Sequence, residues 1–273
     1  MPMRNPYFPI PVVLAALVAA SGCAAGAPGA PSGPQLGAAG VPGFDLRIYP
    51  GAEAMASWRA ASPYRWVGYY LPAPCHTGTS WLGQRAALAA GGWGMAVLFV
   101  GEQDWAETDA AAAGAGERCT RANLTAEHGR AHAAEAHSIT AAEGFPAGTV
   151  IFLDVEPVGD VSAELLAYVR AWTEDLLAAG RYRPGLYAHA SNAPEVHALM
   201  SLAAARAGGG DPPLWVVRPR ADFDLRWAPA ASGVPGADVW QGVLDVAESW
   251  GGVTLVVDRN VARGADPSNA RGR

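Results

Sequence analysis

The segment Val150–Glu156 carries two carboxylates at the end of an apolar run, in the order Val-Ile-Phe-Leu-Asp-Val-Glu. Successive side chains of a strand point to opposite faces, so Phe152, Asp154 and Glu156 share one face. The two acids then lie roughly 6.5–7 Å apart along the strand. Neighbouring carboxylates raise the pKa of one member of the pair, which gives the proton carrier and the ionised partner that glycoside hydrolysis uses. The alternative is a strand-end pair that caps a helix or binds an arginine.

Polar side chains also mark the ends of other predicted strands. These residues are Asp45 on the first strand, Tyr187 and His189 on the fifth, Trp240 and Gln241 on the seventh, and Asp258 on the eighth. The catalytic groups of a (β/α)8 barrel sit at the carboxyl ends of its strands, so we expect all of them near Asp154 and Glu156. The first and last strands of a closed barrel are neighbours, which places Asp45 beside Asp258. We predict Asp154 and Glu156 as the catalytic pair and the other residues as substrate-binding.

Eight short apolar runs alternate with helix-like stretches across the chain. The predicted strands are Gly43–Ile48, Trp66–Leu71, Met95–Val100, Val150–Glu156, Gly185–His189, Leu214–Val217, Val239–Gln241 and Leu255–Asp258. The predicted helices are Ala52–Ala60, Ser80–Ala90, Ala122–Glu143, Ser162–Ala179 and Pro194–Ala205. This alternation predicts an α/β fold with a parallel sheet, a single (β/α)8 TIM barrel over residues 43–263. The last helices should be irregular, because Ala221–Gly236 is rich in proline and glycine.

The order of these motifs resembles that of a known enzyme family. The segments concerned are Gly43-Phe44-Asp45, Leu153-Asp154-Val155-Glu156, Gly185-Leu186-Tyr187, Leu214-Trp215, Val239-Trp240-Gln241 and Val257-Asp258-Arg259-Asn260. They are similar to motifs of glycoside hydrolase family 25 lysozymes, and to a bacterial glycoside hydrolase-like domain of unknown function, family 1906. The resemblance implies cleavage of the β-1,4 bonds of peptidoglycan. It implies Glu156 as general acid and Asp154 as its ionised neighbour, either stabilising the substrate N-acetyl group or activating water.

The sequence departs from the lysozyme pattern in two places. Leu46–Gly51 replaces a serine and an aromatic-glutamine pair, and Val216-Val217-Arg218 replaces a small residue and a tyrosine. Both lie near the expected sugar site. Three functions therefore stay open: an active cell-wall glycan hydrolase, a non-catalytic glycan-binding lipoprotein with the same barrel, and a structural envelope protein. The set of carboxylates argues against the third.

Other polar and aromatic residues are weaker candidates for the site. The aromatic candidates for a sugar cleft are Tyr69, Tyr70, Trp81, Trp93, Trp105, Tyr187, Trp215 and Trp240. Glu102 and Asp104 follow the third strand and fit a solvated loop better than a substrate site. His128, His132 and Glu135 have zinc-like spacing, but lacking a further ligand they are interpreted as an exposed polar helix face. We expect no metal and no cofactor.

Composition excludes several other functions. The chain has 19 Lys+Arg against 25 Asp+Glu, and all of these cations are arginines. A net charge of −6 argues against nucleic-acid binding, which favours basic surfaces. The absence of lysine excludes Schiff-base chemistry and Walker-type phosphate binding. Three cysteines cannot form a four-thiolate site.

The amino-terminal region indicates export. Residues 1–22 have the pattern of a signal peptide, and Ala20-Ser21-Gly22-Cys23 resembles a lipobox, which would attach a lipid to Cys23. Residues 23–42 form an uncharged flexible tether, and residues 264–273 a disordered tail. In an exported chain the other two cysteines, Cys75 and Cys119, should form a disulfide. We expect a monomer that is secreted to the envelope or anchored in the membrane, and cell-wall polysaccharide as its partner.

Overall fold

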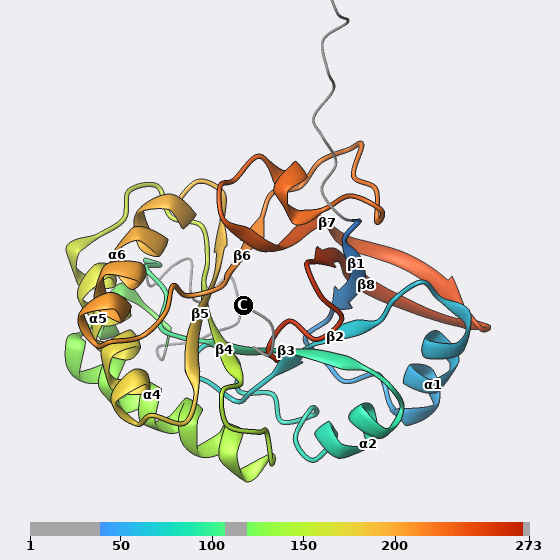
Figure 1. The fold of residues 1–273 in the computed structure, drawn as a ribbon, viewed down its shortest axis with the longest axis horizontal. Coiled ribbons are helices and arrows are strands. Elements are labelled where there is room, and N and C mark those ends of the chain that lie inside the picture. Colours follow the sequence, from blue (N-terminus) through green and yellow to red (C-terminus); the bar gives the residue numbers. More distant parts are fainter. Residues whose placement is uncertain (1–38, 107–118, 270–273) are drawn as a thin grey trace, which may run out of the picture. The chain divides into compact units, whose positions relative to one another are not determined.

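The computed structural model describes residues 39–106 and 119–269, in which eight strands close into a barrel in chain order (Figure 1). The strands are β1 Val41–Asp45, β2 Trp66–Tyr70, β3 Gly94–Val100, β4 Val150–Val155, β5 Arg183–His189, β6 Leu214–Val217, β7 Ala237–Trp250 and β8 Val253–Ala262. The predicted eight-stranded α/β barrel is confirmed. Each predicted strand overlaps an observed one. The first strand ends at Asp45, three residues before its predicted end, and β7 and β8 extend well beyond their predicted bounds.

The prediction of an entirely parallel sheet is wrong for the last strand. Strands β1 to β6 each pair in parallel with the next strand, whereas β8 is antiparallel to both β7 and β1. The cause is the connection after Trp250, which consists of Gly251 and Gly252 with φ of 60° and 81°. A turn this short can make a hairpin, whereas a parallel strand would need a crossover of a dozen residues or so.

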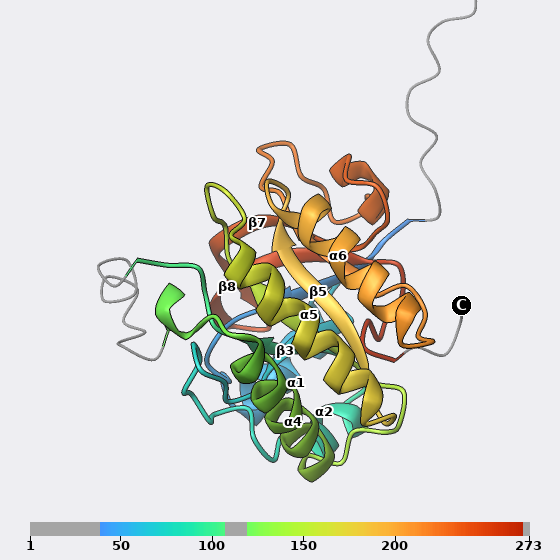
Figure 2. The same cartoon turned by 90° about the vertical axis from the view of Figure 1, so that its left-hand side faces the viewer.

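The helices cover only part of the barrel. They are α1 Ala52–Ala61, α2 Arg85–Ala90, α4 Ala126–Ala142, α5 Ala163–Ala178 and α6 Ala193–Arg206, with 3-10 turns η2 Arg121–Asn123 and η3 Pro229–Ser232. Helices α4, α5 and α6 pack side by side outside the sheet (Figure 2). The prediction of irregular last helices agrees with η3, the helical element between β6 and β7. The far end of the β7–β8 hairpin packs on α1, where the indole Nε1 of Trp58 donates to the carbonyl of Val253 at 3.0 Å.

Aromatic side chains fill the inside of the barrel. Trp215 is completely buried and makes edge-to-face contacts with Trp66, Phe152 and Tyr187, at centroid distances of 5.5, 5.7 and 5.1 Å. These residues come from β2, β4, β5 and β6. This cluster packs the barrel interior beneath the polar side chains at the strand ends.

The segment after β8 is ordered, which corrects the predicted disordered tail for residues 264–269. The amide of Ser268 donates to the carbonyl of Met95, its hydroxyl accepts from the amide of Val97 at 2.8 Å, and its carbonyl accepts from the amide of Val150 at 2.8 Å. Asp266 accepts from the amide of Met95 at 3.0 Å. This segment therefore ties β3 to the start of β4, using backbone pairing instead of an apolar face.

The predicted disulfide between Cys75 and Cys119 is present, with a Cα–Cα distance of 5.3 Å. It joins the loop after β2 to the segment before η2. The signal peptide and Cys23 lie outside the described residues, as does most of the predicted tether. Among the helices that the structure describes, none combines the length and apolar character needed to cross a bilayer.

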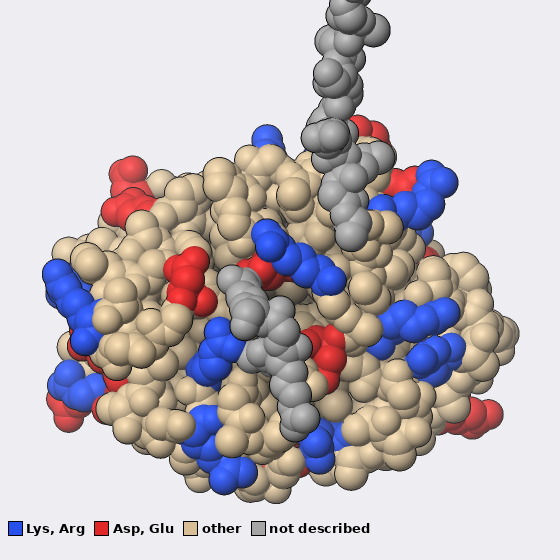
Figure 3. Space-filling view, viewed as in Figure 1, with Lys and Arg blue, Asp and Glu red and all other residues tan. Residues whose placement is uncertain are grey.

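Surface charge is sparse and mixed. On the face shown in Figure 3, arginines and carboxylates are both present, and uncharged surface separates most of them. This pattern agrees with a chain in which 16% of residues are charged.

Candidate active site

Four carboxylates from three strands act on one another electrostatically. Asp45 is the last residue of β1, Asp154 lies one residue before the end of β4, and Glu156 follows that strand directly. Asp258 lies on β8, directly opposite Asp45. The charge of Glu156 raises the pKa values of both Asp154 and Asp258, and the charge of Asp45 raises that of Asp154. The four acids are therefore close enough to influence one another, and their joint action in one catalytic site stays a prediction.

Asp258 reaches the site for a different reason from the one we predicted. Because β8 runs antiparallel, Asp258 is in the middle of a strand and not at its carboxyl end. Its two carboxylate oxygens accept hydrogen bonds from Gln241 Nε2 at 2.5 Å and from the Asp245 amide at 2.7 Å. Burial, assisted by the charge of Asp245, raises the pKa of Asp258 to about 6. Gln241 is thus a partner of the carboxylate and is itself fully buried.

Asp45 is held in a buried polar network. Its exposed fraction is 1%, and its oxygens accept from the Tyr70 hydroxyl at 2.6 Å and from Asn260 Nδ2 at 2.7 Å. Trp215 Nε1 donates to Asn260 Oδ1 at 3.0 Å and thereby fixes the orientation of the amide. Burial, followed by the charge of Asp258, raises the pKa of Asp45 to about 8. Asp45 therefore carries a proton at neutral pH.

Asp154 differs from the sequence expectation in its protonation state. Its exposed fraction is 4%, and its Oδ1 atom has no hydrogen-bond partner among the described residues. Burial, together with the negative charges of Glu156 and Asp45, raises the pKa of Asp154 well above its ordinary value. Sequence analysis treats Asp154 as the ionised member of the pair, but the structure favours its protonated form because the carboxyl is removed from water.

Of the two acids at the end of β4, Glu156 is the one that reaches the solvent. Its side chain is 31% exposed, and its Oε2 atom lies 3.6 Å from His189 Nε2 at the end of β5. The structure therefore brings His189 to the site, as predicted. A partly exposed carboxyl at the strand end can meet a ligand, whereas Asp154 lies below it.

The two aromatic candidates have different environments. Tyr187 is nearly buried, and burial together with the charge of Asp154 raises its pKa, which places it among the acids. Trp240 is fully buried, packs on Phe223 and Trp227, and donates from Nε1 to the carbonyl of Arg218 at 2.9 Å. Because neighbouring strand residues point to opposite faces, the inward position of Gln241 directs Trp240 outward. The structure does not bring Trp240 to the carboxylates.

A cavity of about 340 Å³ opens beside Asp45 and Asp258, and its lining does not include Asp154 or Glu156. Its lining consists of Asp45, Leu46, Arg47, Ile48, Tyr70, Asp245, Val256, Val257 and Asp258. Asp245 and Arg47 are site residues that sequence analysis did not propose. Asp245 has a positive φ of 50° at an irregularity of the β7–β8 pairing, a feature that residue type alone does not reveal.

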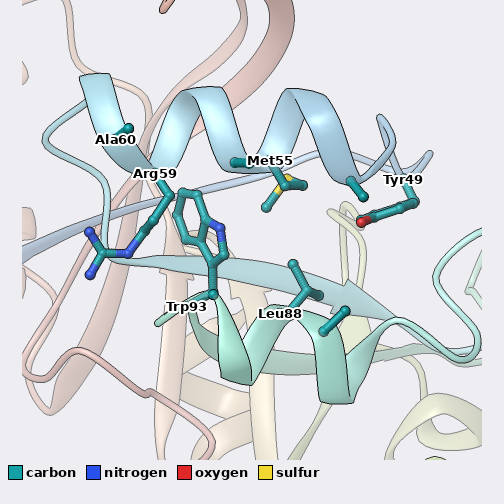
Figure 4. Close-up of a pocket in the computed structure, with 10 residues that line it drawn as sticks. Tyr49, Met55, Arg59, Ala60, Leu88 and Trp93 are labelled. Carbon is teal, nitrogen blue, oxygen red and sulfur yellow. The ribbon is translucent and has the colours of Figure 1, made fainter.

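A second groove, of about 410 Å³, lies between α1 and α2 and has no carboxylate in its lining (Figure 4). Met55, Leu88 and Trp93 give it an apolar wall. Arg59 lies 5.9 Å from the ring centroid of Trp93 and donates to the carbonyl of Gly92 at 3.1 Å. This groove lacks an acid that could protonate a glycosidic oxygen.

Possible metal ligands outside the barrel mouth have other partners. Among the described residues, Cys75, Glu102 and Cys119 have ligand atoms within 4.8 Å of one another, but the two sulfur atoms form the disulfide. His128 contacts the carbonyl of Asn123 at 2.7 Å through Nδ1, and His132 contacts the Tyr168 hydroxyl at 3.0 Å. These histidines are half-buried, and only Glu135 matches the predicted exposed face.

An eight-stranded α/β barrel with a buried carboxylate cluster at the ends of β1 and β4 defines a glycoside hydrolase-like protein. The model of the family described as "Rv2525c-like, glycoside hydrolase-like domain" matches residues 56–262. The chain belongs to this family, as the resemblance in its sequence suggests. No curated protein sequence matches it.

Solved structures share this fold at low sequence identity. The spore cortex lytic enzyme SleM of Clostridium perfringens is 15% identical with a TM-score of 0.51, over 82% of this chain and 67% of that one. A muramidase from Acremonium alcalophilum is 13% identical with a TM-score of 0.50, over 82% and 94%. The Tat-secreted protein Rv2525c of Mycobacterium tuberculosis, in complex with L-tartrate, is 18% identical with a TM-score of 0.50, over 83% and 96%.

Proposed function

We propose that the protein hydrolyses β-1,4 bonds of a peptidoglycan-type cell-wall glycan. The observation that carries this proposal is the pairing of buried Asp154 with partly exposed Glu156 at the end of β4, beside Asp45 and Asp258. Glycoside hydrolysis needs an acid for the leaving oxygen and a second carboxyl group near the anomeric carbon. The likeness in fold to a muramidase and a cortex lytic enzyme supports this choice of substrate.

The geometry suggests a role for each acid. Glu156, the more exposed carboxyl of the β4 pair, is the proton donor and acts from its protonated form. Burial, followed by the charge of Glu156, raises the pKa of Asp154 well above its ordinary value, which disfavours its use as a base for water. Its protonated carboxyl instead donates a hydrogen bond to the carbonyl oxygen of the substrate N-acetyl group. Asp45, Asp258 and Tyr187 shape and polarise the floor of the site.

The test is the release of new reducing ends from purified peptidoglycan. The protein should release them, and the Glu156→Gln variant should not. A wild-type protein that sediments with peptidoglycan yet releases no reducing ends supports the alternative, a glycan-binding lipoprotein. That alternative is favoured by the departure of Leu46–Gly51 from the lysozyme pattern. Arg47, which belongs to this segment, lines the cavity.

We also propose that the protein works outside the cytoplasm, anchored by a lipid on Cys23. The disulfide between Cys75 and Cys119 supports an oxidising compartment. Incorporation of labelled fatty acid into the wild type, and its loss in Cys23→Ala, would test the anchor.

A further inference from the structure

We propose that the buried side-chain amides of Gln103 and Asn192 position Glu156 for proton transfer. They hold its peptide group from the segments that follow the two neighbouring strands, β3 and β5. This inference rests on the proposed hydrolase function. Neither residue belongs to the carboxylate cluster, and no charge is involved.

Glu156 lies just beyond the backbone pairing of its own strand. The pairing of β3 with β4 ends at Val100 and Asp154, and the pairing of β4 with β5 ends at Val155 and Ala188. The peptide group of Glu156 therefore has no partner in either ladder. A loop end in this position would be free to shift.

The chain after β3 cannot extend the ladder, because it turns away toward α5. Gly101 lies so close to Leu153 and Tyr168 that a Cβ atom there would be 2.7 Å from an atom of each. The Glu102 amide then donates to the Tyr168 hydroxyl at 3.3 Å. A contact between this segment and the end of β4 is therefore made by a side chain and not by the backbone.

Gln103 provides that side chain. Its Oε1 atom accepts from the Glu156 amide at 2.9 Å, and its Nε2 atom donates to the Asp154 carbonyl at 2.9 Å. Nε2 also donates to the Gly101 carbonyl at 3.1 Å, and the residue is fully buried. The carboxamide thus takes the place of one backbone peptide in a parallel ladder, and one side chain fixes the backbone of both acids.

Asn192 holds the opposite side of the same residue. Its Nδ2 atom donates to the Glu156 carbonyl at 3.0 Å, and its own amide donates to the His189 carbonyl at 3.1 Å. Asn192 directly precedes α6 and is 2% exposed. The end of β5 is thereby tied to Glu156.

These bonds matter because, among the described residues, the Glu156 carboxyl has no hydrogen-bonded partner and lies only near His189. His189 Nε2, at 3.6 Å, lies beyond ordinary hydrogen-bond distance, and the side chain has several rotatable bonds. The direction in which the carboxyl points therefore depends on the Cα position that the two amides set. A misplacement of about 1 Å costs about 10²-fold in rate.

The test replaces Gln103 by methionine, which has a similar length and lacks both the amide donor and the carbonyl acceptor. We expect kcat on peptidoglycan fragments to fall about 10- to 100-fold with KM nearly unchanged. Thr140→Val is the matched control, because it removes a buried hydrogen bond of 2.6 Å to Ala136 within α4 and leaves the site untouched. Equal kcat values for Gln103→Met and wild type would overturn the proposal.

A second variant separates positioning from general stability. In Gln103→Glu, a protonated carboxyl group can still donate to the Asp154 carbonyl and accept from the Glu156 amide, whereas the carboxylate repels that carbonyl. Its activity relative to wild type should therefore recover as the pH falls. A merely structural role predicts no such recovery.

Hydrogen exchange keeps this test distinct from that of the proposed function. In Gln103→Met, the Glu156 amide should lose protection while that of Leu153, inside β4, keeps it. If the wild type cleaves no glycan, the hydrolase function and the catalytic role of the amides fail together. The hydrogen-exchange measurement then tests the amide contacts independently of activity. Unchanged protection of the Glu156 amide in Gln103→Met would contradict them.

Discussion

Asp45 on β1 and Asp258 on β8 lie directly opposite each other on antiparallel strands, with the carboxyl groups of both in one cavity. Burial raises the pKa of both carboxyl groups, and the charge of Asp258 raises that of Asp45 further. The pKa values rise to about 8 for Asp45 and about 6 for Asp258. Because the pKa of Asp258 is the lower of the two, the pair first ionises on Asp258. Its carboxylate then accepts hydrogen bonds from Gln241 Nε2 and the Asp245 amide.

The stability of the fold should consequently fall with rising pH. The folded-state pKa of Asp45 is raised above its usual 3.8, so its stabilising contribution is full below about pH 4 and is lost as the pH rises to about 8. Each unit of pKa displacement corresponds to roughly 1.4 kcal/mol. Urea denaturation across this range should show the loss, and Asp45→Asn should flatten the profile. Asp222→Asn, at an exposed ion pair, is the control; a profile as steep in Asp45→Asn as in the wild type would contradict the assignment.

The disulfide should contribute strongly to stability. It closes a sequence separation of 44 residues, and on the chain-entropy model its removal costs about 3–4 kcal/mol. Denaturation of the Cys75→Ser and Cys119→Ser double variant should show a lower midpoint than the wild type. Detection of two free thiols by mass spectrometry in the exported wild type would refute the bond.

The carboxyl-terminal segment gives a third prediction. Ser268→Ala removes the acceptor of the buried Val97 amide, and an unsatisfied buried donor costs about 1–3 kcal/mol. The free energy of unfolding, measured in urea, should fall by that amount. Ser249→Ala, on the exposed β7–β8 hairpin, should leave it nearly unchanged. Equal stability of the two variants would show that the segment is not part of the cooperative fold.

Sequence reasoning succeeded where the signal was local. The alternation in Val150–Glu156 placed Asp154 and Glu156 together, because strand geometry depends only on neighbouring residues. The same rule should have separated Trp240 from Gln241, since adjacent strand residues cannot face one site. The antiparallel direction of β8 could have been predicted from Gly251-Gly252, which is a hairpin-turn signal. The expectation of a parallel barrel led us to overlook it.

Other features depend on contacts between distant segments. The raised pKa of Asp154 results from its burial and from the charge of Glu156, neither of which composition shows. Gln103 is one polar residue in a loop, and only the approach of β4 gives it partners. Ser268 joins β3 and β4 through its backbone and hydroxyl. The segment after β8 lacks apolar periodicity, so the sequence pattern did not predict these contacts.

Trp240 and Tyr187 should respond differently to substitution. Trp240→Ala empties a fully buried site between Phe223 and Trp227 and should cost about 3–5 kcal/mol in unfolding free energy. The milder Trp240→Phe should leave glycan affinity unchanged, whereas Tyr187→Phe, among the acids, should weaken it. Binding to soluble peptidoglycan fragments, measured by calorimetry on folded variants, distinguishes them. Reduced affinity in Trp240→Phe alone would place the sugar on the outer side of β7.

The last prediction concerns the acid itself. Glu156→Gln keeps the shape of the side chain and its hydrogen bonds through the backbone to Gln103 and Asn192, but it cannot deliver a proton. Turnover of peptidoglycan should fall about 10²–10⁴-fold, the usual contribution of acid–base catalysis, while glycan affinity stays nearly intact. Glu164→Gln, in the exposed first turn of α5, is the control and should retain full activity. If Glu156→Gln turns over glycan at the wild-type rate, another group donates the proton and the assignment of Glu156 is wrong. If the wild type binds glycan without cleaving it and Glu156→Gln alters only the affinity, Glu156 is a ligand contact in a binding protein.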